Sequence, residues 1–205
     1  MDIGTAPDSG PTGETSAWRP RDVALMALAA AILALPVLAG GGQIHGASAA
    51  PGPGSAAAVS AALAAVLVVL SAVDLAVRRL PDVLTLPLAL AGLAWTWATA
   101  PDMLAWHGLA AIAGYGLLWG VARLYRRARG RPGLGLGDAK LLGVAGAWVG
   151  PQGLTTVLLV GSLAALGVVA VMRWRGRAMT LASAIPFGPF LALGLWVVWL
   201  YGPLA

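Results

Sequence analysis

The chain has 205 residues, of which 59% are hydrophobic and only 10% are charged, and its mean hydropathy is +0.83. This composition cannot give a soluble domain a polar surface, so it indicates a protein whose surroundings are lipid. The net charge of +5 would suggest nucleic-acid binding in a soluble protein, but here it follows from basic residues kept on one side of a membrane. We therefore expect no nucleic-acid partner. The absence of cysteine excludes disulfides, thiolate nucleophiles and cysteine-ligated zinc.

The amino-terminal segment differs from the rest of the chain. Residues 1–22 are polar and rich in Gly, Pro, Ser and Thr, which predicts a disordered cytoplasmic tail. An apolar run at 23–40 and the uncharged Gly- and Pro-rich stretch at 41–55 predict an extra first transmembrane helix and an external loop. A secretory signal is the alternative, because residues 47–49 (Ala-Ser-Ala) resemble a cleavage site. The long acidic tail before the run favours an uncleaved helix.

Further apolar runs of nearly the length needed to cross a bilayer as a helix lie at 56–73, 83–100, 104–122, 153–172 and 181–201. The Gly-rich stretch 133–150 contains two charged residues, yet we predict that it also crosses. Only then do all 13 Lys and Arg residues lie on the cytoplasmic side, as the positive-inside rule requires. The sequence thus predicts an all-α, multi-pass membrane protein with about seven transmembrane helices and a cytoplasmic amino terminus.

Two acids lie where these segments meet the membrane. Asp74 follows the run that enters the cytoplasm, and Asp138 lies about five residues into the Gly-rich segment that leaves it, so both reach the same leaflet. A charge at that depth is costly unless it faces water or a partner, which makes each acid a functional candidate. The glycines support a site here, because irregular backbone at membrane depth is tolerated only where it is packed in protein or lines an aqueous cavity.

Two carboxylates within hydrogen-bond reach share one proton and titrate as a unit. One can then act as general base on a water while the other acts as general acid toward a carbonyl oxygen, which suits peptide hydrolysis. The same two acids would also suit a small membrane transporter or a proton relay. A catalytically silent assembly or scaffold protein is a third hypothesis. The sequence predicts no metal site, no cofactor and no particular oligomeric state.

Three blocks carry a resemblance to a known family. They are DLAVRRLPDVLTLPL from Asp74 to Leu88, GLGDAKLL from Gly135 to Leu142, and IPFGPFLAL from Ile185 to Leu193. In this order they resemble the type IV prepilin peptidases, which are intramembrane aspartic proteases of the GxGD type. The resemblance implies that residues 56–205 form a prepilin peptidase-like membrane domain, that Asp74 and Asp138 are catalytic, and that no cofactor is needed.

The resemblance also implies the partners and the location. The substrates would be the leader peptides of prepilins or pseudopilins, cleaved at the cytoplasmic face of the inner (plasma) membrane. Fuller bacterial members carry a methyltransferase domain with paired CxxC motifs between their first two helices. Here the corresponding stretch is the short loop 41–55 without cysteine, which implies a peptidase-only form without N-methyltransferase activity.

Other residues of these blocks are expected to support the site, each with an alternative role. Gly135 and Gly137 would let another backbone approach closely. Lys140 is either an interfacial anchor that snorkels or a group that holds substrate or biases the charge of the acids. Asp82 is expected to stabilise the start of its helix, and Pro186 and Gly188 to serve packing or a gate. The basic residues between 123 and 131 are a topology signal that contacts lipid headgroups or steers acidic groups.

Overall fold

The computed structural model describes residue 45 and residues 53–77, 79–130, 135–175 and 186–204. Within these ranges the structure is helical and contains no strand. The predicted cytoplasmic tail, the first transmembrane helix and most of the external loop lie outside the described residues. The division of the chain into three parts therefore stays a prediction.

The described helices follow the predicted apolar runs closely. Three stretches are long and apolar enough to cross a membrane, 54–77, 101–129 and 136–174, which confirms an all-α, multi-pass membrane protein. The total of seven crossings and the side on which the amino terminus lies stay predictions. In chain order from residue 53 the helices are α2 (Pro53–Val77), α3 (Asp82–Thr99), the short 3-10 helix η2 (Pro101–Met103), α4 (Leu104–Arg129), α5 (Leu136–Trp174) and α6 (Gly188–Tyr201).

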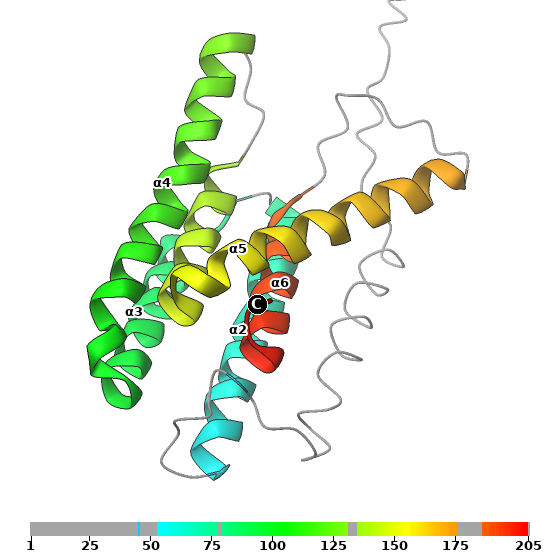
Figure 1. Ribbon diagram of the computed structural model, residues 1–205. Helices are drawn as coiled ribbons and strands as arrows, with labels where there is room; N and C mark the ends of the chain where they lie inside the picture. The colour runs from blue at the N-terminus through cyan, green and yellow to red at the C-terminus, as the bar shows by residue number, and fades with distance from the viewer. Residues whose placement is uncertain (1–44, 46–52, 78, 131–134, 176–185, 205) are drawn as a thin grey trace, which may run out of the picture.

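The two predicted segments 133–150 and 153–172 together form α5, which has a kink at Gly150. This residue has φ 67° and ψ −171°, a conformation that favours glycine, and Pro151 follows it without an N–H to continue the helical hydrogen bonds. A Cβ at position 150 would lie 2.8 Å from His107 Nε2, so the space also requires glycine. Beyond the kink the chain turns back toward the end from which it came (Figure 1).

The first half of α5 forms the centre of the fold. Nearly every residue from Asp138 to Trp148 is buried, with α3, α4 and α6 packed around the helix. Glycines allow this close packing: a Cβ at Gly143 would lie 3.2 Å from the carbonyl oxygen of Ala111, and one at Gly114 would lie 2.7 Å from that of Leu142. Small residues at such contacts are typical of helices packed within a membrane, where close van der Waals contact drives association.

The start of α5 differs from the prediction. The helix begins at Leu136 rather than at 133, because Gly135 has an extended backbone (φ −72°, ψ 140°) and forms the N-cap. Asp138 therefore lies in the first turn of the helix instead of a full turn or more along it. An acid in a first turn is stabilised by the helix dipole.

The outer surface of the bundle is apolar. Large hydrophobic side chains are exposed along α4 and on the part of α5 after the kink, among them Leu109, Ile112, Leu117, Leu124, Leu159, Leu163 and Leu166. In water such a surface would be an aggregation or interaction surface. Around a membrane-spanning bundle it is the surface that contacts lipid.

The helix ends gather the predicted site at one end of the bundle. The carboxyl end of α2, the amino ends of α3, α5 and α6 and the carboxyl end of α4 all point to the upper end in Figure 1. The α2–α3 connection, with Leu80 buried, lies there too. Asp74 and Asp138 therefore come from helices that run in opposite directions, as predicted.

The opposite end of the bundle holds polar contacts made by tryptophan and histidine side chains. Trp199 Nε1 donates to Ser60 Oγ at 2.9 Å, and Trp148 Nε1 donates to the carbonyl oxygen of Leu88 at 2.8 Å. His107 Nδ1 lies 3.0 Å from the carbonyl oxygen of Ala147. The rings of Trp148 and Trp199 meet edge to face, with centroids 5.2 Å apart, an arrangement that favours aromatic contact.

Candidate active site

Asp74 lies near the carboxyl end of α2 and is only 5% exposed. The backbone N–H of Gly188, the first residue of α6, donates a hydrogen bond to Asp74 Oδ2 at 3.2 Å. A buried carboxylate needs such a donor. The amino end of a helix also carries a partial positive charge that favours an anion. The end of one helix thus places the carboxylate against the start of another.

Position 188 requires glycine because the backbone there lies directly against the Asp74 carboxylate. A Cβ at position 188 would lie 2.5 Å from Asp74 Oδ2 and 2.9 Å from its Cγ, which is closer than atoms can approach without a shift. The absence of a side chain therefore lets α6 begin directly against Asp74. Of the two roles expected for Gly188, this geometry supports close packing at the acid. Pro186 is buried just before α6, but residues 181–185, which would complete a gate, lie outside the described residues.

Asp138 reaches the same place from α5 and is 6% exposed. The backbone of Gly135 hydrogen-bonds to its side chain, and Asp138 interacts electrostatically with Asp74. A Cβ at Gly135 would lie 3.4 Å from Asp138 Oδ2, so the N-cap residue packs directly on the carboxyl group. Two different helices therefore bring two buried carboxyl groups into one site.

This arrangement suits a shared proton. Burial removes the water that would screen the two charges, so both groups cannot be ionised at short range without a large cost in free energy. A pair that holds one proton presents a base and an acid side by side. The geometry of Asp74 and Asp138 is thus able to support general acid–base chemistry on a substrate that lies between them.

Gly137 joins the GxGD segment to the α2–α3 connection. A Cβ at this position would lie 3.2 Å from Leu80 Cγ and 3.4 Å from the Leu80 backbone nitrogen. The first distance is tighter than ordinary van der Waals contact, so a side chain at position 137 would require the Leu80 side chain to shift by a few tenths of an ångström. The predicted close approach is present at Gly137, and its partner is Leu80.

Lys140 and Asp82 form an ion pair that ties the same two segments together. Lys140 Nζ lies 2.6 Å from Asp82 Oδ1, with the side chains 29% and 60% exposed, and it donates to the Leu80 carbonyl oxygen at 3.5 Å. The N-cap of α3 is Pro81, so Asp82 lies in the first helical turn. A pair this exposed stabilises a fold by at most about 1 kcal/mol. The pair joins the first turn of α3 to the amino-terminal part of α5.

Two of these contacts could not be found from the sequence. No pattern distinguishes Leu80 from the chain's many other leucines, although its backbone meets both Gly137 and Lys140. The hydrogen bond from Gly188 to Asp74 joins residues 114 positions apart. The only signal for it was the helix interruption around Pro186 and Gly188.

Comparison with known proteins identifies relatives of this chain. The type IV leader peptidase family matches residues 61–170, which is more than half of the chain and includes both acids. A prepilin leader peptidase/N-methyltransferase of Burkholderia pseudomallei (strain 1026b) is 44% identical over 158 residues, covering 77% of this chain and 50% of the relative. A protein of the same description from Aeromonas hydrophila is 40% identical over 155 residues, covering 75% and 52%.

A third relative, from Xanthomonas campestris pv. campestris, has the same description and is 40% identical over 147 residues, covering 68% of this chain and 48% of its own. This chain therefore spans about half the length of the curated relatives that it matches. No solved structure matches it significantly. The matched segment, the three sequence blocks and the paired carboxyl groups all indicate the same family. The chain belongs to the type IV leader peptidase family.

Proposed function

We propose that this chain is an aspartic endopeptidase that removes the leader peptide from type IV prepilin-like or pseudopilin substrates at the cytoplasmic face of the inner membrane. The observation that carries the proposal is the meeting of Asp74 and Asp138, both buried and in electrostatic contact, from two different helices. Membership of the leader peptidase family supports the substrate class.

The two acids would divide the chemistry between them. The ionised carboxylate takes a proton from a water, whose oxygen forms a bond to the scissile carbonyl carbon. The protonated carboxyl group donates to the carbonyl oxygen. As the tetrahedral intermediate collapses, the C–N bond breaks, the leaving amine takes a proton from the pair, and one hydroxyl group of the intermediate returns its proton to the pair, which again holds one proton. The hydrogen bonds from Gly188 and Gly135 would hold the two carboxyl groups in orientation.

Lys140 and Asp82 would act as positioning residues. Their ion pair and the packing of Gly137 on Leu80 connect the segment after Asp74 to the helix that carries Asp138. A shift of about 1 Å in a catalytic group can lower a rate about a hundredfold. This effect is far larger than the ~1 kcal/mol of stability that an exposed ion pair contributes, so the pair matters for geometry more than for stability.

The proposed reaction stops at cleavage. The chain contains no cysteine, and the stretch 41–55 between the first two apolar runs is too short to hold a methyltransferase domain. We therefore propose that this chain does not methylate the new amino terminus. This separates it from the bifunctional description of its relatives.

The test is cleavage of a type IV prepilin by the purified chain, with a labelled methyl donor present and the product measured by intact mass. The wild-type protein should give a shortened, unlabelled product, and Asp74→Asn and Asp138→Asn should each give none while accumulating in the membrane. Asp102→Asn is the matched control, since Asp102 lies in η2 at the opposite end of α4, and it should cleave normally. Wild-type cleavage by either site variant would exclude the aspartic mechanism, and label in the product would exclude a peptidase-only form.

The cytoplasmic placement of the site has its own test. We propose that all 13 basic residues face the cytoplasm, so reporter fusions after Leu80, Arg129 and Gly176 should report cytoplasm. Fusions after Ala50 and Asp102 should report the outside. An external signal at Arg129 would contradict the seven-helix topology and would place Asp138 on the wrong face.

A further inference from the structure

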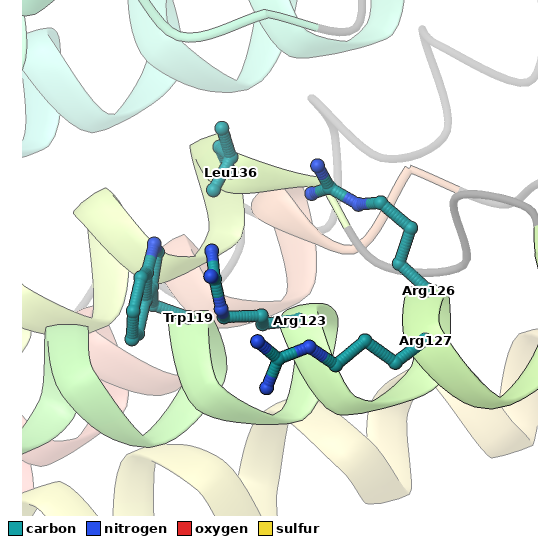
Figure 2. Close-up of a pocket in the computed structure, with 5 residues that line it drawn as sticks. All are labelled: Trp119, Arg123, Arg126, Arg127 and Leu136. Atoms are coloured by element: carbon teal, nitrogen blue, oxygen red, sulfur yellow. The ribbon is translucent and has the colours of Figure 1, made fainter.

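The carboxyl end of α4 and the start of α5 border an open basic cavity of about 300 Å³. We call it the Arg pocket; it is lined by Trp119, Arg123, Arg126, Arg127 and Leu136. Figure 2 shows the arginine side chains extending from α4, with Arg126 reaching toward Leu136. The pocket is separate from the paired acids, although Leu136 lies only two residues before Asp138.

The geometry of the Arg pocket fits an anion. The guanidinium carbon of Arg123 lies 5.4 Å from the centroid of the Trp119 ring, within the range of a cation–π contact. Arg126 and Arg127 lie in the last turn of the same helix. At spacings of three and four residues from Arg123 they share one side of α4. Three like charges around one hollow repel one another unless a negative group lies between them.

The described part of the protein offers no such group. Beyond residue 22 the chain has only four acids. Asp74 and Asp138 are buried in the candidate active site, Asp82 pairs with Lys140, and Asp102 lies at the other end of α4. Among the described residues, no carboxylate forms an ion pair with the three arginines of the pocket. The anion would therefore come from outside this part of the protein.

The surroundings of the pocket indicate what that anion is attached to. On the same side of α4 as the arginines, seven and four residues before Trp119, the helix exposes Ile112 (72%) and Tyr115 (42%). The helix belongs to a candidate membrane span that ends at Arg129. A ligand that fits both the arginines and the apolar surface of α4 has a negative headgroup and apolar chains. Basic pockets beside membrane helices are typical sites for anionic headgroups.

We infer that the Arg pocket binds the phosphate of an anionic phospholipid, whose acyl chains lie along the exposed apolar face of α4. The bound headgroup would neutralise the arginines and contact Leu136 at the start of α5. It would thereby hold the first turn of the helix that carries Asp138. The inference does not depend on the proposed peptidase activity.

The test uses the full chain purified in a neutral detergent, and its readouts are thermal unfolding and retention of added lipid. Phosphatidylglycerol should raise the unfolding temperature and stay bound, whereas phosphatidylcholine and inorganic phosphate at equal concentration should not. Arg126→Gln/Arg127→Gln should weaken phosphatidylglycerol binding roughly thirtyfold, since each arginine near a headgroup contributes about a factor of five or six. Arg126→Lys/Arg127→Lys, which keeps the charge, should retain most of the binding.

The matched control is Arg173→Gln/Arg175→Gln, which removes two charges at the other end of α5 and should bind phosphatidylglycerol like the wild type. Equal weakening by both glutamine pairs would mean attraction to general surface charge and would overturn the site. Equal stabilisation by inorganic phosphate would make the pocket a free-anion site and would overturn the lipid assignment. Equal retention of phosphatidylcholine would also overturn it.

Discussion

The two ends of this helical bundle both bury polar groups, but of opposite kinds. At the end with Trp148 and Trp199 the buried polar groups are neutral, and each indole N–H donates to a partner on another helix. At the other end two buried carboxyl groups, Asp74 and Asp138, interact electrostatically. Neutral, satisfied contacts stabilise a fold. Burying two acidic groups near each other costs free energy that an apolar pair would not cost, so this placement is typical of a functional site.

The difference extends to the packing. The neutral end is filled by large rings, with Trp95, Trp148 and Trp199 in edge-to-face contact. The acidic end is held by backbone contacts through Gly135, Gly137 and Gly188. Substitutions at the neutral end should therefore lower stability, and substitutions at the acidic end should lower activity. The predictions below test this separation.

Gly188→Ala should have the largest effect among the residues around the acids. The added methyl group would lie 2.5 Å from Asp74 Oδ2, so either Asp74 or the start of α6 must move. We expect prepilin cleavage to fall about a hundredfold or more, as for a misplaced catalytic group. The initial cleavage rate of purified variant and wild type would measure it.

Gly116→Ala is the control for this prediction, because a Cβ at Gly116 meets no atom within 4 Å. Alanine also has a higher helix propensity than glycine. Activity should be unchanged and the unfolding temperature equal or slightly higher. Full activity in Gly188→Ala would show that the contact between α6 and Asp74 does not position the carboxylate.

Lys140→Met should have an intermediate effect. Loss of the ion pair with Asp82 should lower kcat roughly tenfold or more through misplacement of α5, with KM nearly unchanged and with stability lowered by no more than about 1 kcal/mol. Lys140→Arg should keep most of the activity. The exchanged pair Asp82→Lys/Lys140→Asp should recover part of it.

A different pattern would assign Lys140 another role. If Lys140→Met raised KM while kcat stayed constant, and the exchanged pair recovered nothing, the lysine would contact substrate instead of positioning the helix. Unchanged values of both constants would leave it as an interfacial anchor.

Trp199→Phe should have the smallest effect on cleavage and a clear effect on stability. Trp199 is fully buried, and the variant loses the hydrogen bond to Ser60 Oγ and part of the ring contacts. The free energy of unfolding should fall by about 1–3 kcal/mol, while the cleavage rate at low temperature should match the wild type. A large loss of activity without a loss of stability would contradict the separation of the two ends.

The sequence predicted the helices and the meeting of the two acids better than it predicted the contacts that hold the acids in place. Hydropathy and the placement of basic residues brought Asp74 and Asp138 to one leaflet, because both signals extend over whole segments. The start of α5 was misplaced because the backbone conformation of Gly135 is not visible in a run of glycines and leucines. The partner of Lys140 depends on how α3 and α5 pack, which no local pattern encodes.

The central claim is that Asp74 and Asp138 act as one unit, and a double-mutant cycle on single-turnover prepilin cleavage tests it most directly. The rates of Asp74→Asn, Asp138→Asn and the double variant would be compared with wild type in proteins of equal unfolding temperature. Groups that act together give non-additive losses, so we predict that the double variant is no slower than the slower single variant. Losses that multiply, or a single variant that cleaves at the wild-type rate, would contradict the account.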